Sequence, residues 1–240
     1  MVVPSQVGRF IFVTGLTAGF SGLVVVRTLR GNDGAAGELS PVWARRVARG
    51  IGMQVRIFGA EHIDRHGPQV FMCNHQSNTD IIALLAAMPV RLGFMAKSEL
   101  RDVPIFGRAM AAGGHVFIDR KDRQDAHAAI RRAAGDVREG RNLVVFPEGT
   151  RSAAGTVKRF KKGGFHLAQQ ARVPIVPVGI RGTARVLPKH SKAIAPGAVE
   201  VHVGASIPAD EVEGHALDEL VDLVRRRVGD LSAMRLVDER

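Results

Sequence analysis

The stretch QVFMCNHQSNTDIIALL, residues 69–85, decides the fold. Its apolar run from Val70 to Cys73 predicts a buried strand, and the apolar residues that start at Ile81 predict a helix directly afterwards. Between them lies a polar cluster, Asn74 to Asp80. Because open α/β sheets build their sites at the carboxyl ends of their strands, we expect functional side chains in this cluster.

Short β-rich runs alternate with helical patterns along the rest of the chain, which favours an α/β fold with a mainly parallel sheet. Apolar residues at helical spacing predict two helices, one at 126–137 with Gly140 placed to stop it and one at 217–231. We expect a mostly parallel central sheet of about seven strands flanked by helices. The expected strands lie at 55–59, 69–73, 92–96, 115–118, 142–146, 174–180 and 199–204.

The N-terminal region holds two apolar segments. Residues 10–26 carry no charge, but this length is at the lower edge for spanning a bilayer, and the bulky basic residues that follow argue against a cleaved signal peptide. Residues 41–55 are typical of an amphipathic helix with a basic side and with Trp43 at a lipid interface. We expect residues 1–55 to form a helical hairpin, linked through residues 31–38, that dips into one leaflet. The alternative is a helical cap packed on the remaining domain, residues 56–240.

The composition narrows the partners of the chain. A formal charge of +11 over 240 residues implies an attraction to an acidic partner, such as an anionic lipid surface or a phosphorylated substrate. The absence of Tyr and the single Trp argue against nucleic acid, as does the lack of helix-turn-helix or zinc-finger spacing. The one cysteine, Cys73, excludes an internal disulfide and a multi-cysteine metal site, and it fits the reducing cytoplasm.

His75 and Asp80 are the candidate catalytic residues of the polar cluster. Asp80 lies at the start of the predicted helix, where its carboxylate can accept a hydrogen bond from one imidazole nitrogen while the other nitrogen faces a substrate hydroxyl. That pairing makes a general base near neutral pH. The alternative is that Asp80 only favours a helix N-terminus and that His75 is an ordinary loop histidine. The chain has no HExxH, GxSxG or GxxxxGK[ST] motif, which argues against zinc hydrolysis, the usual serine hydrolases and P-loop chemistry.

A second polar segment, FPEGTRS at 146–152, follows another predicted strand. Arg151 can bind a phosphate through two hydrogen bonds, and Gly149 allows the backbone to approach closely. The basic residues in 158–162 can add to a phosphate cradle together with the next helix N-terminus, or they form only a solvated loop.

Two more blocks also end or contain predicted strands. Residues 113–120 end in Asp119 and Arg120, which can equally form a surface salt bridge. Residues 173–182 are an apolar strand that carries two prolines, and we expect it to be a rigid groove wall.

Together the blocks resemble the 1-acylglycerol-3-phosphate acyltransferase family, also called lysophosphatidic acid acyltransferases, within the glycerolipid acyltransferases. The resemblance covers residues 55–204, and the order and separation of the blocks make it specific; they are HQSNTD at 75–80, GHVFIDR at 114–120, FPEGTRS at 146–152 and VPIVP at 173–177. It implies that His75 deprotonates the acceptor hydroxyl and that Asp80 orients His75, beside a tunnel for the acyl chain. It also implies a hairpin that docks in one leaflet and a basic acceptor pocket formed by Lys97, Arg120, Glu148, Gly149, Thr150 and Arg151.

The expected reaction transfers a fatty acyl group from acyl-CoA or acyl carrier protein to the sn-2 hydroxyl of 1-acylglycerol 3-phosphate, giving phosphatidic acid, at the cytoplasmic face of the cell membrane. It needs no cofactor and no metal, because a thioester is already activated. Cys73 is expected to be a buried structural thiol, so that a Cys73→Ala variant keeps its activity. Backbone amides near Gly179 or Gly149 are candidate oxyanion donors.

Two alternatives to this reaction stay open. The same chemistry can act on another acceptor: glycerol 3-phosphate, another lysophospholipid, a lyso-ornithine lipid or a glycolipid. The chain can also be a non-catalytic lipid-binding protein, although such a protein has no need of a base.

Overall fold

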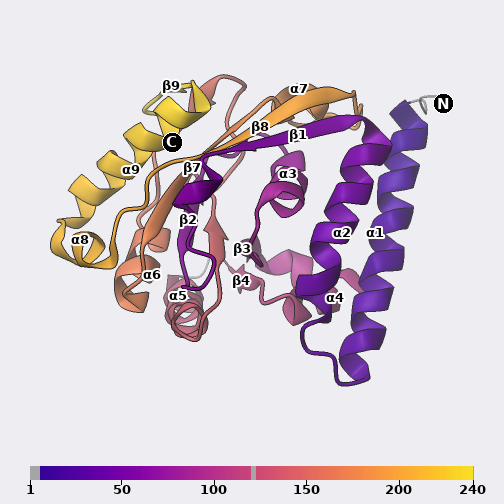
Figure 1. Ribbon diagram of the computed structural model, residues 1–240, viewed down its shortest axis with the longest axis horizontal. Coiled ribbons are helices and arrows are strands. Elements are labelled where there is room, and N and C mark those ends of the chain that lie inside the picture. The colour runs from indigo at the N-terminus through magenta and orange to yellow at the C-terminus, as the bar shows by residue number, and fades with distance from the viewer. Residues whose placement is uncertain (1–5, 120–122, 240) are drawn as a thin grey trace.

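The computed structural model describes residues 6–119 and 123–239 and is built around a seven-stranded sheet (Figure 1). Its strands are β1 Met53–Phe58, β2 Val70–Cys73, β3 Gly93–Lys97, β4 Val116–Ile118, β5 Leu143–Val145, β7 Ile175–Arg181 and β8 Gly197–Val203. Their order is β1-β8-β7-β2-β5-β3-β4, and every neighbouring pair is parallel except β7 with β8. The seven predicted strands and the mostly parallel sheet are therefore confirmed.

Helices cover both faces of this sheet (Figure 1). Phe71 and Cys73 belong to the hydrophobic cluster on one face, whereas Val70 and Met72 belong to the cluster on the other, as the alternation of a strand requires. The first cluster includes α2 Ala35–Ile51, α3 Thr79–Ala87 and α7 Thr183–Val186; the second includes α5 Arg123–Arg138, α6 Gly163–Ala171, α8 Ala209–Gly214 and α9 Leu217–Ser232. The helices predicted at 126–137 and 217–231 correspond to α5 and α9.

The N-terminal hairpin consists of α1, Gln6–Leu29, and α2. The segment Gly8–Leu29 of α1 is long and apolar enough to cross a membrane by length and composition. α2 begins at Ala35, six residues before the predicted start, and contains Pro41. It ends at Ile51 rather than at Val55, because Gly52 adopts a left-handed conformation with φ 75° and β1 starts directly afterwards.

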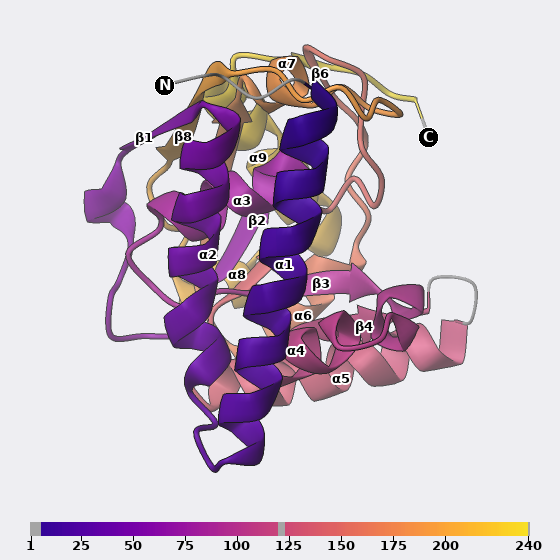
Figure 2. The ribbon, with the colours of Figure 1, turned by 90° about the vertical axis from the view of Figure 1, so that its right-hand side faces the viewer.

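The hairpin packs on the sheet domain (Figure 2). A hairpin that docks in a leaflet can make the same contacts, so its docking stays a prediction. Val47 and Ile51 of α2 are fully buried in the first hydrophobic cluster. α1 packs against α2 and against α4, Phe106–Ala112. Trp43 is partly buried, and its indole Nε1–H donates to Thr17 Oγ1 of α1 at 3.2 Å. Its place at a lipid interface stays a prediction.

Two 3-10 helices and two short strands complete the described part of the chain. The 3-10 helices η1, Ala60–His62, and η2, Ser98–Asp102, follow β1 and β3. A separate two-stranded sheet pairs β6, Thr156–Val157, with β9, Arg235–Leu236, and this sheet is absent from the sequence-based expectation.

Candidate active site

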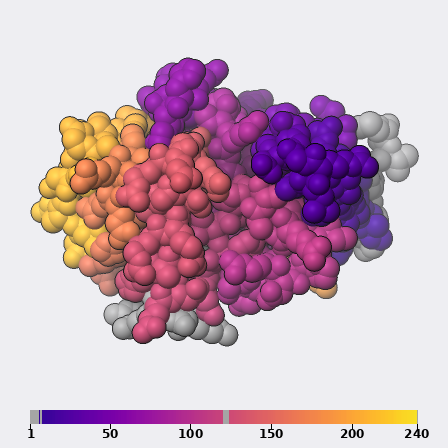
Figure 3. Space-filling model, turned by 90° about the horizontal axis from the view of Figure 1, so that it is seen from below, coloured from indigo at the N-terminus to yellow at the C-terminus, as the bar shows by residue number. Residues whose placement is uncertain are grey.

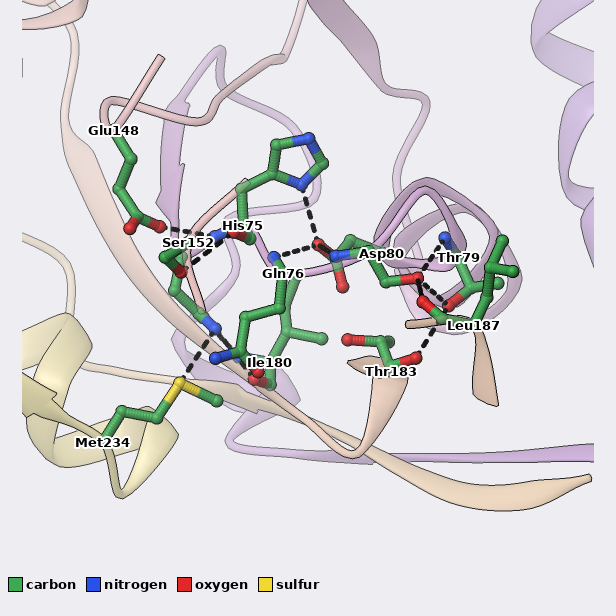
Figure 4. Close-up of polar contacts among 12 residues, drawn as sticks. His75, Gln76, Thr79, Asp80, Glu148, Ser152, Ile180, Thr183, Leu187 and Met234 are labelled. Carbon is green, nitrogen blue, oxygen red and sulfur yellow. Dashed lines mark hydrogen bonds and ion pairs between the residues drawn. The ribbon is translucent and has the colours of Figure 1, made fainter. Parts of the chain in front are cut away.

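His75 follows β2 directly, and Asp80 lies in the first turn of α3 (Figure 4). His75 Nδ1 and Asp80 Oδ2 are 2.7 Å apart, and the carboxylate is fully buried while the imidazole is 17% exposed. The other ring nitrogen, Nε2, points away from Asp80 (Figure 4). When Nδ1–H donates to the carboxylate, Nε2 carries the free lone pair, so the pair has the geometry of an oriented general base.

The same carboxylate oxygen also fixes the turn that carries His75. Oδ2 of Asp80 accepts the backbone N–H groups of Gln76, at 2.8 Å, and Ser77, at 2.9 Å. Asp80 therefore favours the start of α3 and holds the imidazole at once. Asp80 thus contacts His75 as the first sequence interpretation requires, and it also lies in the first turn of α3 as the second does. The catalytic role of the pair stays a prediction.

Glu148 fastens the loop after β5 to the loop after β2. Its Oε1 accepts the backbone N–H of His75 at 2.7 Å, and its Oε2 accepts that of Lys158 at 2.8 Å. The carbonyl of His75 in turn accepts the N–H of Ser152 at 2.8 Å. Burial raises the pKa of Glu148, while the two backbone hydrogen bonds act in the opposite direction. Glu148 thus positions the backbone of His75.

A row of four rings crosses the sheet at the site, and the sequence did not indicate it. His75 stacks on Phe146 with centroids 4.1 Å apart; Phe146 faces Phe94 at 6.3 Å, and Phe94 faces His115 at 5.6 Å. These rings come from the neighbouring strands β2, β5, β3 and β4 or the residues beside them. Burial lowers the pKa of His115 to about 4, and its Nδ1 has no hydrogen-bond partner among the described residues.

All four rings line one cavity of about 470 Å³ between the hairpin and the sheet domain. Its walls are mostly apolar, and they include Thr17, Phe20, Ser21, Val24, Leu39, Ser40, Trp43, Ile81, Leu85, Met95, Ala96, Leu100, Phe106, Ala109 and Met110. α1, α2, α3 and α4 each contribute to this list. A volume of this kind with an apolar wall and one oriented base suits a substrate with a long hydrocarbon part.

Most of the predicted acceptor-binding residues line the same cavity. Lys97 at the end of β3, Thr150 and Arg151 lie on its wall together with His75, and so does Gly149. Gly149 has φ 72°, a conformation that glycine adopts without the strain that other residues meet there. Arg120 lies outside the described residues.

Two other predicted contributors lie elsewhere. In the basic stretch 158–162, Lys162 pairs with Asp218 at 2.6 Å and Arg159 pairs with Asp238 at 3.8 Å. None of the basic residues of this stretch lines the cavity. The predicted helix after this stretch is α6, which begins at Gly163.

We expected residues 173–182 to form a groove wall, and the structure corrects this expectation. This segment forms β7, which lies inside the sheet between β8 and β2 with six of its seven residues buried, and none of its described residues lines the cavity. Gly179, near which we expected an oxyanion donor, does not line the cavity. Its Cα packs against α9, where a Cβ would be 2.3 Å from the carbonyl carbon of Leu231. Arg181 donates through Nε to the Leu231 carbonyl at 2.9 Å.

Cys73 is fully buried in β2, as predicted for a structural thiol. Burial raises its pKa well above the usual value, and the negative charge of Asp80 adds to the effect. A thiol in this state is a poor nucleophile, because the thiolate is the reactive form.

The chain is similar in sequence and in structure to known acyltransferases. A 1-acyl-sn-glycerol-3-phosphate acyltransferase of Saccharomyces cerevisiae is 34% identical over 75% of this chain, and the alpha form from Homo sapiens is 35% identical over 72%. The chain spans 60% and 62% of the length of these two relatives. The crystal structure of the 1-acyl-sn-glycerophosphate (LPA) acyltransferase PlsC from Thermotoga maritima is 27% identical, covers 94% of each chain and has a TM-score of 0.78.

The match to a family model is the most direct of these comparisons. The model described as Acyltransferase matches residues 54–181, which is more than half of the chain and includes the His75 and Asp80 pair together with the loop after β5. The chain therefore belongs to the acyltransferase family.

Proposed function

We propose that the protein transfers a fatty acyl group from a thioester to the sn-2 hydroxyl of 1-acylglycerol 3-phosphate, giving phosphatidic acid. One observation carries this proposal: the buried Asp80 orients His75 toward an apolar cavity whose wall also holds Lys97 and Arg151. The relatives named 1-acyl-sn-glycerol-3-phosphate acyltransferase support the choice of substrate.

His75 is the proposed general base. Asp80 holds Nδ1–H, so Nε2 takes the proton of the acceptor hydroxyl as its oxygen attacks the thioester carbonyl. The carboxylate stabilises the imidazolium that forms. Collapse of the tetrahedral intermediate breaks the carbon–sulfur bond, and the departing thiolate takes the proton from His75. The stack on Phe146 restricts the ring to this orientation.

The acceptor phosphate is proposed to bind at the basic end of the cavity. Arg151 can hold two phosphate oxygens, and Lys97 adds a second positive charge. Arg120 is proposed as a third positive charge, and only the resemblance of the GHVFIDR block to the acyltransferase family supports it. Glu148 contributes through the backbone of His75 and through the turn that carries Gly149 and Thr150.

The oxyanion of the tetrahedral intermediate needs donors near the thioester carbonyl. Among the described residues, the backbone N–H groups of Thr150 and Arg151 have no hydrogen bond to another residue, and both residues line the cavity with His75. We propose these two amides as the donors. Direct transfer to the acceptor hydroxyl uses no covalent enzyme intermediate, no metal and no cofactor, because the donor is already an activated acyl group.

The partners follow from the charge and the hairpin. Acyl-CoA and acyl carrier protein are both anionic, and each suits a chain with a net charge of +11. The hairpin is proposed to dock in one leaflet at the cytoplasmic face of the cell membrane, held by its apolar residues and by anionic lipids.

A panel of acceptors tests the reaction. The purified protein is incubated in detergent or liposomes with long-chain acyl-CoA and, in separate reactions, with 1-acylglycerol 3-phosphate, glycerol 3-phosphate and lysophosphatidylcholine. In a parallel set of reactions, acyl carrier protein that carries the same fatty acyl group replaces the acyl-CoA. We expect phosphatidic acid from the first acceptor at the highest kcat/KM. A higher kcat/KM for another acceptor would reassign the substrate, and lipid binding without product from any pair would show a binding protein.

A further inference from the structure

The segment from η2 into α4 exposes large apolar side chains. Leu100 is 37% exposed, Val103 is 42% exposed and Ile105 is 52% exposed. Large apolar side chains at three of six consecutive positions form a patch, and such a patch marks an interaction site more often than a lone exposed residue does. We call residues 100–108 the η2–α4 turn.

The backbone of the η2–α4 turn is strained at the most exposed of these residues. Ile105 has φ 65° and ψ −53°, and the N–H of Phe106 donates to the carbonyl of Pro104 at 2.6 Å. This is a γ-turn of the rare, strained form, and a β-branched residue at positive φ is an outlier in any turn. Strained residues persist where the surrounding structure fixes them, and they are concentrated at functional sites.

The surroundings do fix this turn. The N–H of Gly107 donates to the carbonyl of Val103 at 2.8 Å. A Cβ on Gly107 would lie 2.0 Å from the carbonyl oxygen of Arg101, so the two backbones approach as closely as glycine allows. Ile105 is therefore held outward by a tightly built turn.

The turn leads into α4, and α4 packs on a hairpin that has exposed apolar residues of its own. α4 packs along α1, and Figures 2 and 3 show the two side by side. α1 exposes its own large apolar residues, Phe10, Ile11, Phe12, Leu23, Val26 and Leu29. Exposed arginines lie on both elements. The turn holds Arg101 and Arg108 together with one exposed carboxylate, Asp102, and the end of α1 holds Arg30 and Arg27, which pairs with Glu38 at 3.6 Å. Apolar side chains with flanking arginines match a bilayer that contains anionic lipids.

The turn also forms part of the cavity. Leu100 is exposed and lines the cavity at the same time, so it lies at the rim, and Phe106 lies on the wall. Lys97, Thr150 and Arg151 lie on the polar part of the same wall. A lipid in a leaflet that touches Leu100 thus has an apolar route to His75.

We propose that the η2–α4 turn is a second membrane anchor, which inserts Ile105, Val103 and Leu100 into an anionic leaflet beside α1 and places the apolar rim of the cavity against the lipid. This inference rests on the proposed docking of the hairpin. In this proposal, the free energy that Ile105 gains by insertion into the bilayer exceeds the cost of its strained backbone.

Vesicle binding of substituted proteins tests the anchor. The full-length protein and the variants Ile105→Gly, Ile105→Asn and Ile105→Leu are mixed with vesicles of equal parts phosphatidylcholine and phosphatidylglycerol. We expect about a tenfold loss of partitioning for Gly and Asn, and near-native partitioning for Leu. Thermal unfolding of Ile105→Gly is expected at the native temperature or above it, because glycine relieves the strain at positive φ. Phe58→Asn is the control, since Phe58 is 44% exposed on β1 and does not line the cavity.

A fluorescent probe locates the insertion directly. In a Cys73→Ala background, the new thiol of Ile105→Cys or of Phe58→Cys carries an environment-sensitive dye, and we expect vesicles to shift the emission only at position 105. The anchor proposal would be overturned if the native protein binds vesicles, Ile105→Asn partitions as the native protein does, and the dye at position 105 shows no shift. The docking of the hairpin would then still stand. Failure of the native protein to bind vesicles would overturn the docking of the hairpin as well.

Discussion

At the scale of single residues, the site depends on carboxylates that each hold more than one group. Oδ2 of Asp80 accepts three hydrogen bonds, from the imidazole of His75 and from two backbone N–H groups. The two oxygens of Glu148 accept the N–H groups of His75 and Lys158. The position of the His75 ring is thus set through its side chain by α3 and through its backbone by the loop after β5.

Glu148→Gln tests the backbone support. A glutamine has only one oxygen, so one of the two N–H groups would face an amide N–H₂ and lose its acceptor. We expect the free energy of unfolding to fall by about 1–3 kcal/mol and kcat to fall with it, since His75 moves. Urea unfolding and steady-state kinetics measure the two effects. Native stability together with native kcat would show that Glu148 does not support His75.

His115 predicts a dependence of stability on pH. The unfolded chain protonates this imidazole near its ordinary pKa of 6.5, whereas the folded chain does so only near about 4, so protons favour the unfolded state in that window. From about pH 7 to about pH 5, we expect this group to lower the free energy of unfolding by about 2 kcal/mol. His115→Phe keeps the ring and removes the titration. Urea unfolding at the two pH values should show the loss in the native protein and a smaller one in the variant; equal losses would contradict the assignment.

The sequence predicted part of this site for a physical reason. His75 and Asp80 are five residues apart at the junction of a strand and a helix, so local geometry alone can bring them together. Phe94, His115 and Phe146 come from three strands, and only the strand order places their rings beside His75. The sequence assigned Glu148 to the acceptor site, and its contact with the backbone of His75 appears only in the folded chain.

At the scale of elements, the burial of each strand was easier to predict from the sequence than its place in the sheet. Five of the seven strands are mainly apolar runs, and β1 and β8 alternate apolar with polar residues; both patterns are typical of strands, which is why all seven were found. The proline-bearing run 173–182 was interpreted as a groove wall, yet β7 lies inside the sheet. Periodicity and composition report burial, but they contain no information on which strand lies beside which. The sequence did not predict the pairing of β6 with β9, because a strand of only two residues leaves no recognisable pattern.

Gly179→Ala tests the packing of β7 on α9. A methyl group at this position would meet backbone atoms of Leu231 and Ser232 at 2.3 Å, and backbone cannot move aside as a flexible side chain can. We expect a loss of stability of about 1–3 kcal/mol from this overpacking. At a temperature where the variant stays folded, kcat should be close to native, because Gly179 does not line the cavity. A native melting temperature, or a large loss of kcat in the folded variant, would contradict this account.

At the scale of the whole molecule, charge and apolar surface lie together on the hairpin. Arg45, Arg46 and Arg49 are exposed on α2, beside the exposed apolar residues of α1. The net charge of +11 adds a general attraction to anionic surfaces.

Salt should therefore weaken binding to anionic vesicles. Raising the salt from about 0.1 M to about 1 M shortens the screening length from about 10 Å to about 3 Å. We expect the partition coefficient on vesicles with phosphatidylglycerol to fall, while the smaller value on pure phosphatidylcholine changes little. Flotation of the protein with each kind of vesicle measures both. A partition coefficient on anionic vesicles that does not depend on salt would show that the arginines take no part.

The central claim is that His75, oriented by Asp80, is the base for acyl transfer. The most direct measurement compares kcat for 1-acylglycerol 3-phosphate and a long-chain acyl-CoA among the native protein, His75→Ala and Asp80→Asn, with the melting temperature and acceptor binding recorded for each. We expect kcat to fall by about 10²–10⁴-fold in both variants, with both still folded and binding the acceptor. A folded His75→Ala variant that forms phosphatidic acid at the native kcat would contradict the account.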